Sequence, residues 1–434
     1  MNRLSAVVLG LLGLVCLTGC PQQPAAPPAA PKVEAQPDDP ALIEKYAKQG
    51  AVVRLNGAKQ VVDFNWQRTK SFEAADEADA FLQEIGAWQE LERLVLSGPG
   101  IGDDSLKHLA AFPKLRIFDC ENSVISDAGM DHLVALPKLE ALFLRRANLT
   151  GKAIETLSAS KTLKRIGVRY TNVDDVGLAA AARMPQLVEL QLRGCRVTGE
   201  GLQQILGLQN LESLEVWGSG FDDEHLAPLG KLTKLRKLLV EDTRLKDPGM
   251  AAWKELVNLE ELGLDRTLVG NEGFAVVANM PKLRVLLVRD TLVTDVGLQH
   301  VAGLKNLTQL DLSEGIFGDD GVKHLSGLTN LVELSLWSTS TTDEGLKALE
   351  PLTKIKTLNL DNTRITDDGL KSLAGMTGLT ELDLSNTQVT SAGVESLAAF
   401  KQLKSLKLNQ CLNVGSDALD KLKAALPGLE TQGP

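Results

Sequence analysis

Apolar residues recur in this chain with a fixed period of 24 residues. Each period opens with the pattern L-x-x-L-x-L, as at Leu379, Leu382 and Leu384. The alternation around the last two apolar positions has a period of two, which predicts a short strand with one buried face. The opening residues of the fourteen units are Leu91, Leu115, Leu139, Leu163, Leu187, Leu211, Leu235, Leu259, Leu283, Leu307, Leu331, Ile355, Leu379 and Leu403. One repeating element therefore accounts for most of the 434 residues.

The second half of each unit has the pattern of a short helix. The phrase T-D-x-G-L is present in full at residues 294–298 and 366–370. Threonine or aspartate at its start is placed to accept a hydrogen bond from a free N–H group of the first helical turn. Apolar residues then follow at helical spacing, for example Leu370, Leu373 and Met376. Each unit is predicted to consist of a strand, a turn, a helix and a second turn.

A unit of this size cannot bury its own apolar stripe, so neighbouring units must stack, with strands about 4.8 Å apart in a parallel sheet. The L-x-x-L-x-L frame, from Leu91 to about Leu429, resembles the leucine-rich repeat family. Its T-D-x-G-L ending is similar to the ribonuclease-inhibitor-like branch. The resemblance implies an α/β horseshoe with a parallel sheet on the concave face, helices on the convex face, and a role in protein binding.

The first forty residues have the pattern of an export signal and a tether. Arg3 precedes an apolar run at residues 4–17, which is shorter than the roughly 20 residues that span a bilayer. The run ends in Leu17-Thr18-Gly19-Cys20, which resembles the bacterial lipobox. This resemblance implies removal of residues 1–19 and attachment of a diacylglycerol to Cys20, although an ordinary signal peptide with an incidental cysteine is the alternative. Residues 20–40 are rich in proline and alanine, which predicts an extended tether.

The two ends of the repeat array are predicted to be capped. Residues 41–90 are expected to form an N-terminal cap, with a helix at 41–49, a hairpin around Asn56-Gly57 and a helix at about 73–85. Val61, Phe64 and Trp66 match the strand positions of a degenerate unit. Residues 91–434 are expected to hold the fourteen units and a C-terminal cap with a helix at 416–426. Caps are needed because each end of a solenoid exposes an apolar layer.

Composition and motifs argue against several functions. The net charge of −10 argues against nucleic acid as the main partner. Glycine motifs for phosphate binding are missing from the sequence, and no nucleophile has a convincing histidine and aspartate set, so we expect neither a cofactor nor enzymatic activity. The aspartate column suggests helix capping rather than a metal site, and the histidine column falls on the outer helices. Cys120, Cys195 and Cys411 are predicted to be buried thiols, because their units are too far apart for a disulfide.

The inner face of units three to six differs from the rest. The third, fifth and seventh positions of each unit point out of the sheet, and the eighth lies at its edge. These units place there Phe143, Arg145, Arg146, Arg165, Arg169, Tyr170, Arg193 and Trp217. Arg145, Arg169 and Arg193 share one column, so their charges must be compensated, either by a partner or internally by Glu189 and Glu215.

Exposed aromatic and arginine side chains are typical anchors of protein interfaces. We therefore expect these residues to bind a protein partner at the cell envelope, on the periplasmic or the cell-surface side. A neutral surface remains the other interpretation of the same residues. Two alternatives for the whole protein are a binder of anionic carbohydrate or polymer, through the same arginines, and a structural spacer with no specific ligand. A second, weaker apolar group is formed by Leu239, Val285, Leu287 and Trp337.

Overall fold

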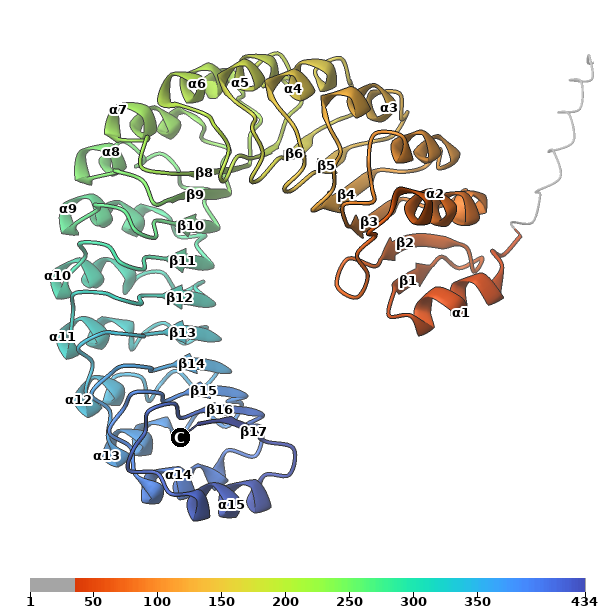
Figure 1. The fold of residues 1–434 in the computed structure, drawn as a ribbon. Coiled ribbons are helices and arrows are strands. Elements are labelled where there is room, and N and C mark those ends of the chain that lie inside the picture. The colour runs from red at the N-terminus through yellow and green to blue at the C-terminus, as the bar shows by residue number, and fades with distance from the viewer. Residues whose placement is uncertain (1–35, 434) are drawn as a thin grey trace, which may run out of the picture. The chain divides into compact units, whose positions relative to one another are not determined.

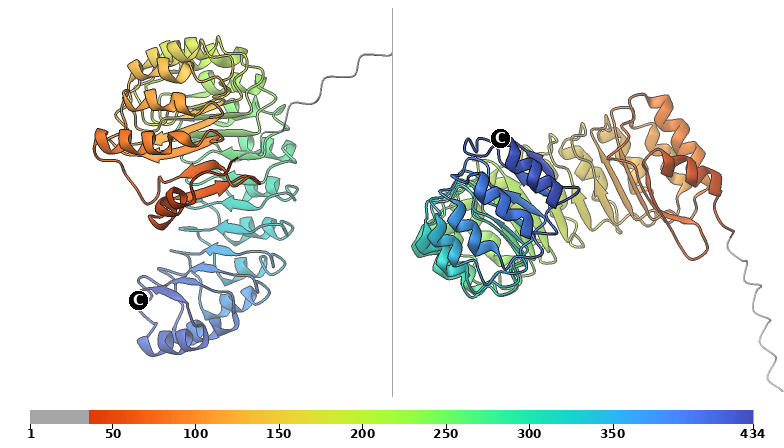
Figure 2. Two further views of the ribbon diagram at one scale, coloured as in Figure 1. Left: turned by 90° about the vertical axis from the view of Figure 1, so that its right-hand side faces the viewer. Right: turned by 90° about the horizontal axis from the view of Figure 1, so that it is seen from below.

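The computed structural model of the chain describes residues 36–433. The predicted signal segment and Cys20 lie outside these residues, as does most of the predicted tether. Residues 37–434 form one compact unit. In this unit the strands lie side by side along the hollow side of an open arc, and the helices lie along its outer side (Figure 1). The further views in Figure 2 show the same two layers.

The strands of the described residues form a single 17-stranded sheet in sequence order. The first two strands are antiparallel, and all later neighbours are parallel. From β3 to β16 the register is 24 residues, so that Leu286 pairs with Leu310 and Leu310 with Leu334. The strands are β1 (Val52–Leu55), β2 (Val61–Asn65), β3 (Arg93–Ser97), β4 (Ile117–Glu121), β5 (Ala141–Phe143), β6 (Arg165–Gly167), β7 (Glu189–Gln191), β8 (Ser213–Trp217), β9 (Lys237–Glu241), β10 (Glu261–Gly263), β11 (Val285–Leu287), β12 (Gln309–Asp311), β13 (Glu333–Ser335), β14 (Thr357–Asn359), β15 (Glu381–Asp383), β16 (Ser405–Lys407) and β17 (Glu430–Gln432). The predicted horseshoe fold is confirmed.

Short helices follow the strands, and many of them end in a 3₁₀ turn. The α-helices are α1 (Pro40–Lys48), α2 (Ala75–Glu84), α3 (Met130–Val134), α4 (Gly151–Leu157), α5 (Asp175–Ala181), α6 (Gly199–Gln204), α7 (Asp223–Leu226), α8 (Asp247–Ala251), α9 (Asn271–Phe274), α10 (Asp295–Leu298), α11 (Asp319–Val322), α12 (Asp343–Lys347), α13 (Asp367–Leu370), α14 (Ser391–Ser396) and α15 (Ser416–Ala425). The 3₁₀ helices are η1 (Ile85–Ala87), η2 (Ser105–Ala111), η3 (Asp127–Gly129), η4 (Ile205–Gly207), η5 (Ala227–Lys231), η6 (Ala275–Asn279), η7 (Gln299–Val301), η8 (Lys323–Leu325), η9 (Lys371–Leu373) and η10 (Leu397–Ala399).

Leucine layers fill the space between the sheet and the helices. Leu262, Leu286 and Leu382, at the fourth position of their units, are 0–2% exposed. A buried threonine hydroxyl closes the turn after the strand in many repeats: that of Thr171 donates to the Val168 carbonyl over 2.7 Å. The Cys195 thiol occupies the same position of its repeat and donates to the same carbonyl over 3.1 Å. Cysteine thus takes the place of threonine there. Cys120 and Cys411 are buried as predicted, whereas Cys195 is partly buried, and its partial burial raises the pKa of its thiol.

The aspartate column has a role that differs from the predicted one. Thr150 caps its own helix by accepting from the backbone N–H of Lys152. The Asp127 carboxylate instead reaches the next repeat, where it accepts from the backbone N–H of Thr150 over 2.8 Å and from its hydroxyl over 2.5 Å. The same pair of bonds recurs at Asp319 and Thr342. The aspartates therefore join neighbouring repeats, and helix capping in these repeats falls to the threonines.

Both ends of the array are covered. The hairpin of β1 and β2 is present, and Tyr46 of α1 packs edge-on against Phe64 and Trp66, with ring centroids 5.9 and 5.0 Å apart. At the other end, α15 is followed by strand β17, which pairs with β16 through Glu430 and Ser405. The sequence analysis did not predict this last strand, because residues 430–432 lack the apolar alternation of the repeats.

In each of the fourteen repeats, the turn after the strand has one residue with a positive φ. This residue is the eighth of its unit, and in eleven repeats it is not glycine, with φ between 50° and 62°. Its N–H group continues the sheet: that of Tyr170 donates to the Arg193 carbonyl over 2.7 Å. Asparagine, aspartate and glycine tolerate this conformation best. Arg146 and Tyr170, with φ of 56° and 57°, are bulkier than these usual occupants, as are Arg266, Glu314 and Gln410 in later repeats. Tyr170 is the aromatic residue among them.

Candidate functional site

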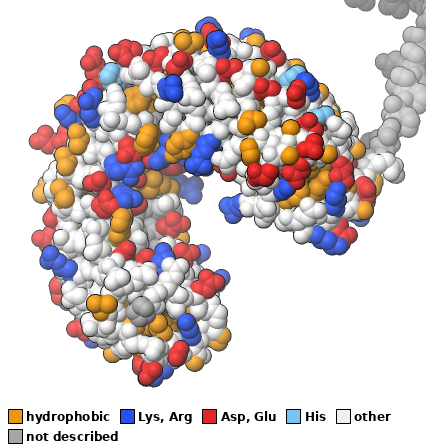
Figure 3. Space-filling view, viewed as in Figure 1, with side chains coloured by type: hydrophobic (Ala, Val, Ile, Leu, Met, Phe, Trp, Pro, Cys, Tyr) orange, Lys and Arg blue, Asp and Glu red, His pale blue; other side chains and the backbone are white. Residues whose placement is uncertain are grey.

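The predicted patch lies on strands β5 to β8 and on the turns that follow them. Phe143, Arg145, Arg165 and Arg193 are half-buried on the hollow side of the sheet, and Tyr170 and Trp217 are exposed to 39% and 38%. Basic, acidic and hydrophobic side chains lie next to one another on the inner wall of the arc (Figure 3). The stack of parallel strands thus places side chains from different repeats on one surface.

Three of the predicted residues lie around Tyr170. Its ring lies 5.6 Å from the Arg145 guanidinium and 5.5 Å from that of Arg146. Its hydroxyl accepts a hydrogen bond from Arg193 Nε over 3.0 Å. The ring also crosses Gly194, where a β-carbon would lie 2.5 Å from Tyr170 Cδ1. The aromatic ring is therefore held in place by three arginines and a glycine while one side stays open to solvent.

Glutamates from other repeats compensate the arginine column internally. Arg145 Nη1 lies 3.4 Å from Glu121, and Arg169 Nη2 donates to Glu215 over 2.6 Å. Arg193 forms an ion pair with Glu241, two repeats away. The predicted role of Glu215 as an internal partner is confirmed. Glu189 accepts from the Gln191 amide instead, so its predicted pairing with an arginine is wrong.

The remaining predicted residues lie at the margins of this cluster. Trp217 Nε1 donates to Asp242, which fixes the indole at the end of β8. The guanidinium of Arg146 lies 3.4 Å from the Asn122 amide oxygen. Among residues 36–433, Arg165 has no carboxylate within 4 Å. The strands therefore bring Arg145, Arg146, Tyr170 and Arg193 into direct contact, and place Arg165 and Trp217 beside them.

Beside the tyrosine cluster the sheet has a hollow of about 300 Å³, which we call the Gly167 hollow. Its floor is Gly167, which lacks a side chain where the neighbouring repeats carry Phe143 and Gln191. A β-carbon at Gly167 would lie 2.5 Å from Phe143 Cδ1 and 2.8 Å from Gln191 Oε1, so both side chains lean over the gap. The lining residues are Gln67, Asp119, Glu121, Phe143, Arg145, Gly167, Arg169 and Gln191.

Asp119 was not among the predicted residues, and it differs from the other charged groups of the hollow. Among residues 36–433 its carboxylate accepts no hydrogen bond and has no cationic nitrogen within 4 Å. Burial raises the pKa of its carboxyl group to about 6, partly opposed by the more distant Arg93. The fifth position of the unit marks it as inward-facing in the sequence, but its lack of a partner depends on where the arginines point.

The second apolar group lies further along the same wall. Leu239, Val285, Leu287 and Trp337 are all half-buried there, on strands β9 and β11 and after β13. Gly263 lies between Leu239 and Leu287 and repeats the arrangement at Gly167: a β-carbon there would lie 2.7 Å from Leu239 Cδ2. Arg289 stacks over the Trp337 ring at 4.6 Å and pairs with Glu314 over 2.6 Å. This part of the wall is more apolar than the tyrosine cluster.

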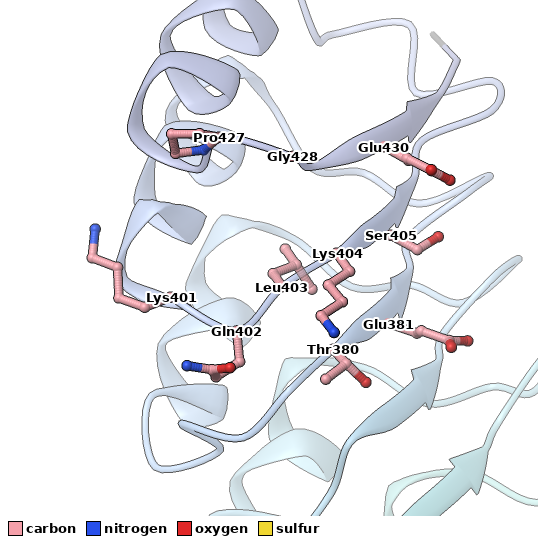
Figure 4. Close-up of a pocket in the computed structure, with 10 residues that line it drawn as sticks. All are labelled: Thr380, Glu381, Lys401, Gln402, Leu403, Lys404, Ser405, Pro427, Gly428 and Glu430. Atoms are coloured by element: carbon pink, nitrogen blue, oxygen red, sulfur yellow. The ribbon is translucent and has the colours of Figure 1, made fainter.

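Two larger hollows lie on the edges of the sheet. One, of about 650 Å³, is near the C-terminal cap (Figure 4). There the side chains of Glu381, Ser405 and Glu430 point to one side and those of Lys401 and Gln402 to the other, so they do not converge on a common point. The other, of about 740 Å³, is lined by Arg236, Lys282, Arg284 and Lys354 together with Glu260. Neither has the convergent polar groups and enclosed apolar wall of a typical small-molecule site.

The described residues contain no group of three or more histidine, cysteine, aspartate or glutamate side chains arranged to hold a metal ion. Nor does any helix in residues 36–433 have the length and apolar character needed to cross a bilayer.

Comparison with known families identifies the class of protein. A family model described as "Leucine-rich repeat region" matches residues 94–346, and a second, described as "Leucine rich repeat", matches residues 353–412. The chain therefore belongs to the leucine-rich repeat family, whose members typically mediate protein binding. A comparison with curated protein sequences finds no significant match.

Solved structures share the same fold. An internalin from Listeria monocytogenes is 21% identical and aligns with a TM-score of 0.57 over 82% of this chain and 93% of its own. A leucine-rich repeat protein of Leptospira interrogans is 17% identical and aligns with a TM-score of 0.53 over 84% of this chain and 99% of its own. At these identities the likeness concerns the solenoid fold.

Proposed function

We propose that this protein is a non-enzymatic binding module of the bacterial cell envelope that holds another protein on the hollow side of its sheet. Tyr170 is the observation that carries the proposal. It is a large ring in the left-handed backbone region, 39% exposed and held by three arginines. Such a backbone conformation costs about 1–2 kcal/mol for a bulky residue, so a stable fold alone would favour asparagine or glycine there. A rigid, exposed aromatic ring loses little entropy on binding, which makes it a good anchor.

The charges around the ring bear on the alternative functions. An anionic carbohydrate or polymer would need cations that are free to bind it. Among residues 36–433 the patch leaves only Arg146 and Arg165 without a carboxylate within 4 Å, because Glu121, Glu215 and Glu241 compensate Arg145, Arg169 and Arg193. A structural spacer would have no reason to keep an exposed aromatic side chain at the strained position of Tyr170. Both points favour a protein partner, anchored by Tyr170 and Trp217, with the arginines fixing the rings in place.

Replacing Tyr170 and Trp217 together by alanine is expected to weaken capture of the partner at least tenfold, because each ring contributes exposed apolar area to the contact. The measurement uses immobilised protein from residue 37 onward, envelope extract from the bacterium, and mass spectrometry of what is retained. The free energy of unfolding should change by less than about 1 kcal/mol, since both rings are on the surface.

Leu412→Ala is the matched control, because Leu412 is 87% exposed in the last repeat, away from the patch. It should leave capture unchanged. Equal capture by the Tyr170 and Trp217 variant would show that the partner binds elsewhere, and failure of the unaltered protein to retain any partner would favour the spacer alternative. Weakening of capture by salt alone, with binding of sulfated or uronate polymers, would favour the anionic-polymer alternative.

We further propose that the protein is a lipoprotein, anchored through Cys20 and the proline-rich tether. The resemblance of residues 17–20 to a lipobox supports this. In cells grown with an alkyne-tagged fatty acid, the protein should become labelled and sediment with the membranes. Cys20→Ala should remove the label and release the protein from the membranes, because a thiol is needed for the thioether bond. Labelling of that variant to the same extent would contradict the proposal.

A further inference from the structure

The Gly167 hollow is shaped to hold one long side chain. Its volume of about 300 Å³ is at the lower end of the range for ligand pockets in proteins. The strand backbone at Gly167 forms the floor, and Phe143 and Gln191 form two walls. Strands β4 to β7 and the turns after them supply all of the lining except Gln67, so the hollow is built on four neighbouring repeats in regular register.

Of the charged side chains that line the hollow, the two arginines are paired with glutamates and one aspartate is not. Arg145 pairs with Glu121, and Arg169 pairs with Glu215, which is 2% exposed. Asp119 is the carboxylate left without a cation among residues 36–433. Asp119 is half-buried, and a negative charge partly shielded from water is unfavourable unless it is compensated. Arg145 Nε and Arg169 Nε are also buried without an acceptor, but both belong to guanidinium groups whose charge a glutamate compensates. The charge of the hollow that lacks a counter-ion is therefore the negative one on Asp119.

The uncharged walls fit a cationic ligand as well. The Phe143 ring forms one side of the hollow, and the face of an aromatic ring attracts an ammonium or guanidinium group. The Gln191 amide nitrogen donates to Glu189, which leaves its oxygen, the atom that leans over Gly167, free to accept from a ligand. The apolar stem of lysine or arginine could lie along the ring while its charged end reaches Asp119.

From this arrangement we propose that the Gly167 hollow binds a lysine or arginine side chain of the partner protein, with Asp119 as its counter-ion. This inference rests on the proposed function, since it assigns the chemistry of the partner. The arginines of the patch then position Tyr170 and shape the hollow, and are not themselves the groups that pair with the partner's charges.

The pH dependence follows from the state of Asp119. Burial raises its pKa to about 6; Arg93, Arg145 and Arg169 act to lower the pKa and Glu121 acts to raise it. The carboxyl is charged above pH 6 and gains a proton below it, so a cationic ligand is held most tightly above pH 6. Because the folded pKa exceeds the unfolded value of about 3.9, the charged form opposes folding near pH 7. Asp119→Asn should therefore fold normally and melt at the same or a higher temperature.

The test uses fluorescein-labelled pentapeptides of glycine and serine that differ only in the central residue, which is lysine, norleucine or glutamate. Fluorescence polarisation is measured with the protein from residue 37 onward. At pH 7.5 the lysine peptide should bind at least tenfold more tightly than the other two, and this preference should fall about tenfold between pH 6.5 and 5. Asp119→Asn should abolish the preference.

Asp383→Asn is the matched control, because Asp383 occupies the same fifth position of a repeat near the C-terminal end and should not alter the preference. Equal binding of the lysine and norleucine peptides up to about 5 mM, a preference for glutamate, or a preference retained in Asp119→Asn would each overturn the inference. Capture of a partner from extract by Asp119→Asn as strong as by the unaltered protein would overturn it too, while leaving the proposed function standing. Failure of the unaltered protein to capture any partner would instead count against the proposed function.

Discussion

Gly201→Ala is expected to lower the free energy of unfolding by about 2–4 kcal/mol. A β-carbon at this position would lie 1.9 Å from Asp175 Oδ1, so the carboxylate would have to move. Asp175 accepts hydrogen bonds from the Thr198 N–H over 2.8 Å and from its hydroxyl over 2.7 Å. Displacing it breaks the clamp between two repeats, and urea unfolding followed by circular dichroism would measure the loss.

A double-mutant cycle separates this cause from ordinary helix propensity. Gly201 has a helical backbone conformation, where alanine by itself is more favourable than glycine by about 0.4–1 kcal/mol. In an Asp175→Ala background the clash is gone, so Gly201→Ala should become neutral or stabilising. If alanine costs as much in that background as in the unaltered protein, the carboxylate is not the reason for the glycine.

Arg193→Glu is expected to destabilise the protein by about 2–4 kcal/mol, and by more than Arg193→Ala. Arg193 is the cation paired with Glu241, a side chain that is only 7% exposed. Its loss leaves a buried carboxylate uncompensated, and a second negative charge adds repulsion. Thermal unfolding at pH 7 and moderate salt would show this as a fall in the melting temperature.

Combining Arg193→Glu or Arg193→Ala with Glu241→Gln should recover a large part of the lost stability, because the buried negative charge is then removed together with its partner.

Arg145→Glu offers a comparison. The ion pair of Arg145 with Glu121 is longer, at 3.4 Å, and the Arg145 side chain is more exposed than that of Arg193, so the loss of stability should be smaller. Equal losses at Arg145 and Arg193 would contradict the role of burial. Charge reversal of the arginines is thus unsuitable as a pure test of binding, unlike the replacement of Tyr170 and Trp217.

The fold was predictable from the sequence because of its repetition. Leu286, Leu310 and Leu334 hold the same position in neighbouring repeats, and all three are buried between the sheet and the helices. Every further repeat with leucine at this position supports the same register. The inward-facing positions of Phe143, Arg145 and Arg193 followed from the same alternation. Strand β17 escaped prediction because it is held by pairing with β16, and its own residues, Glu430 to Gln432, carry no strand pattern.

The chemistry of the candidate site depended on contacts between repeats that the period does not specify. The sequence shows that Arg169 and Glu215 face the same way, but the bond between them spans 46 residues and depends on how two long side chains turn. The bonds from the aspartates to the next repeat could not be predicted for the same reason. Asp127 lies at the start of its own helix, which suggested a cap, and yet its carboxylate accepts from Thr150 of the next repeat.

By itself, then, the sequence determined which residues are buried, which face the hollow side and how the repeats stack, because a period of 24 residues allows one solution that buries every apolar stripe. Only the tertiary structure decided which charges are compensated. It pairs Arg145 and Arg169 with glutamates and leaves Asp119 without a cation, because ion pairs are selected by distances of a few ångströms across strands and not by position within a repeat.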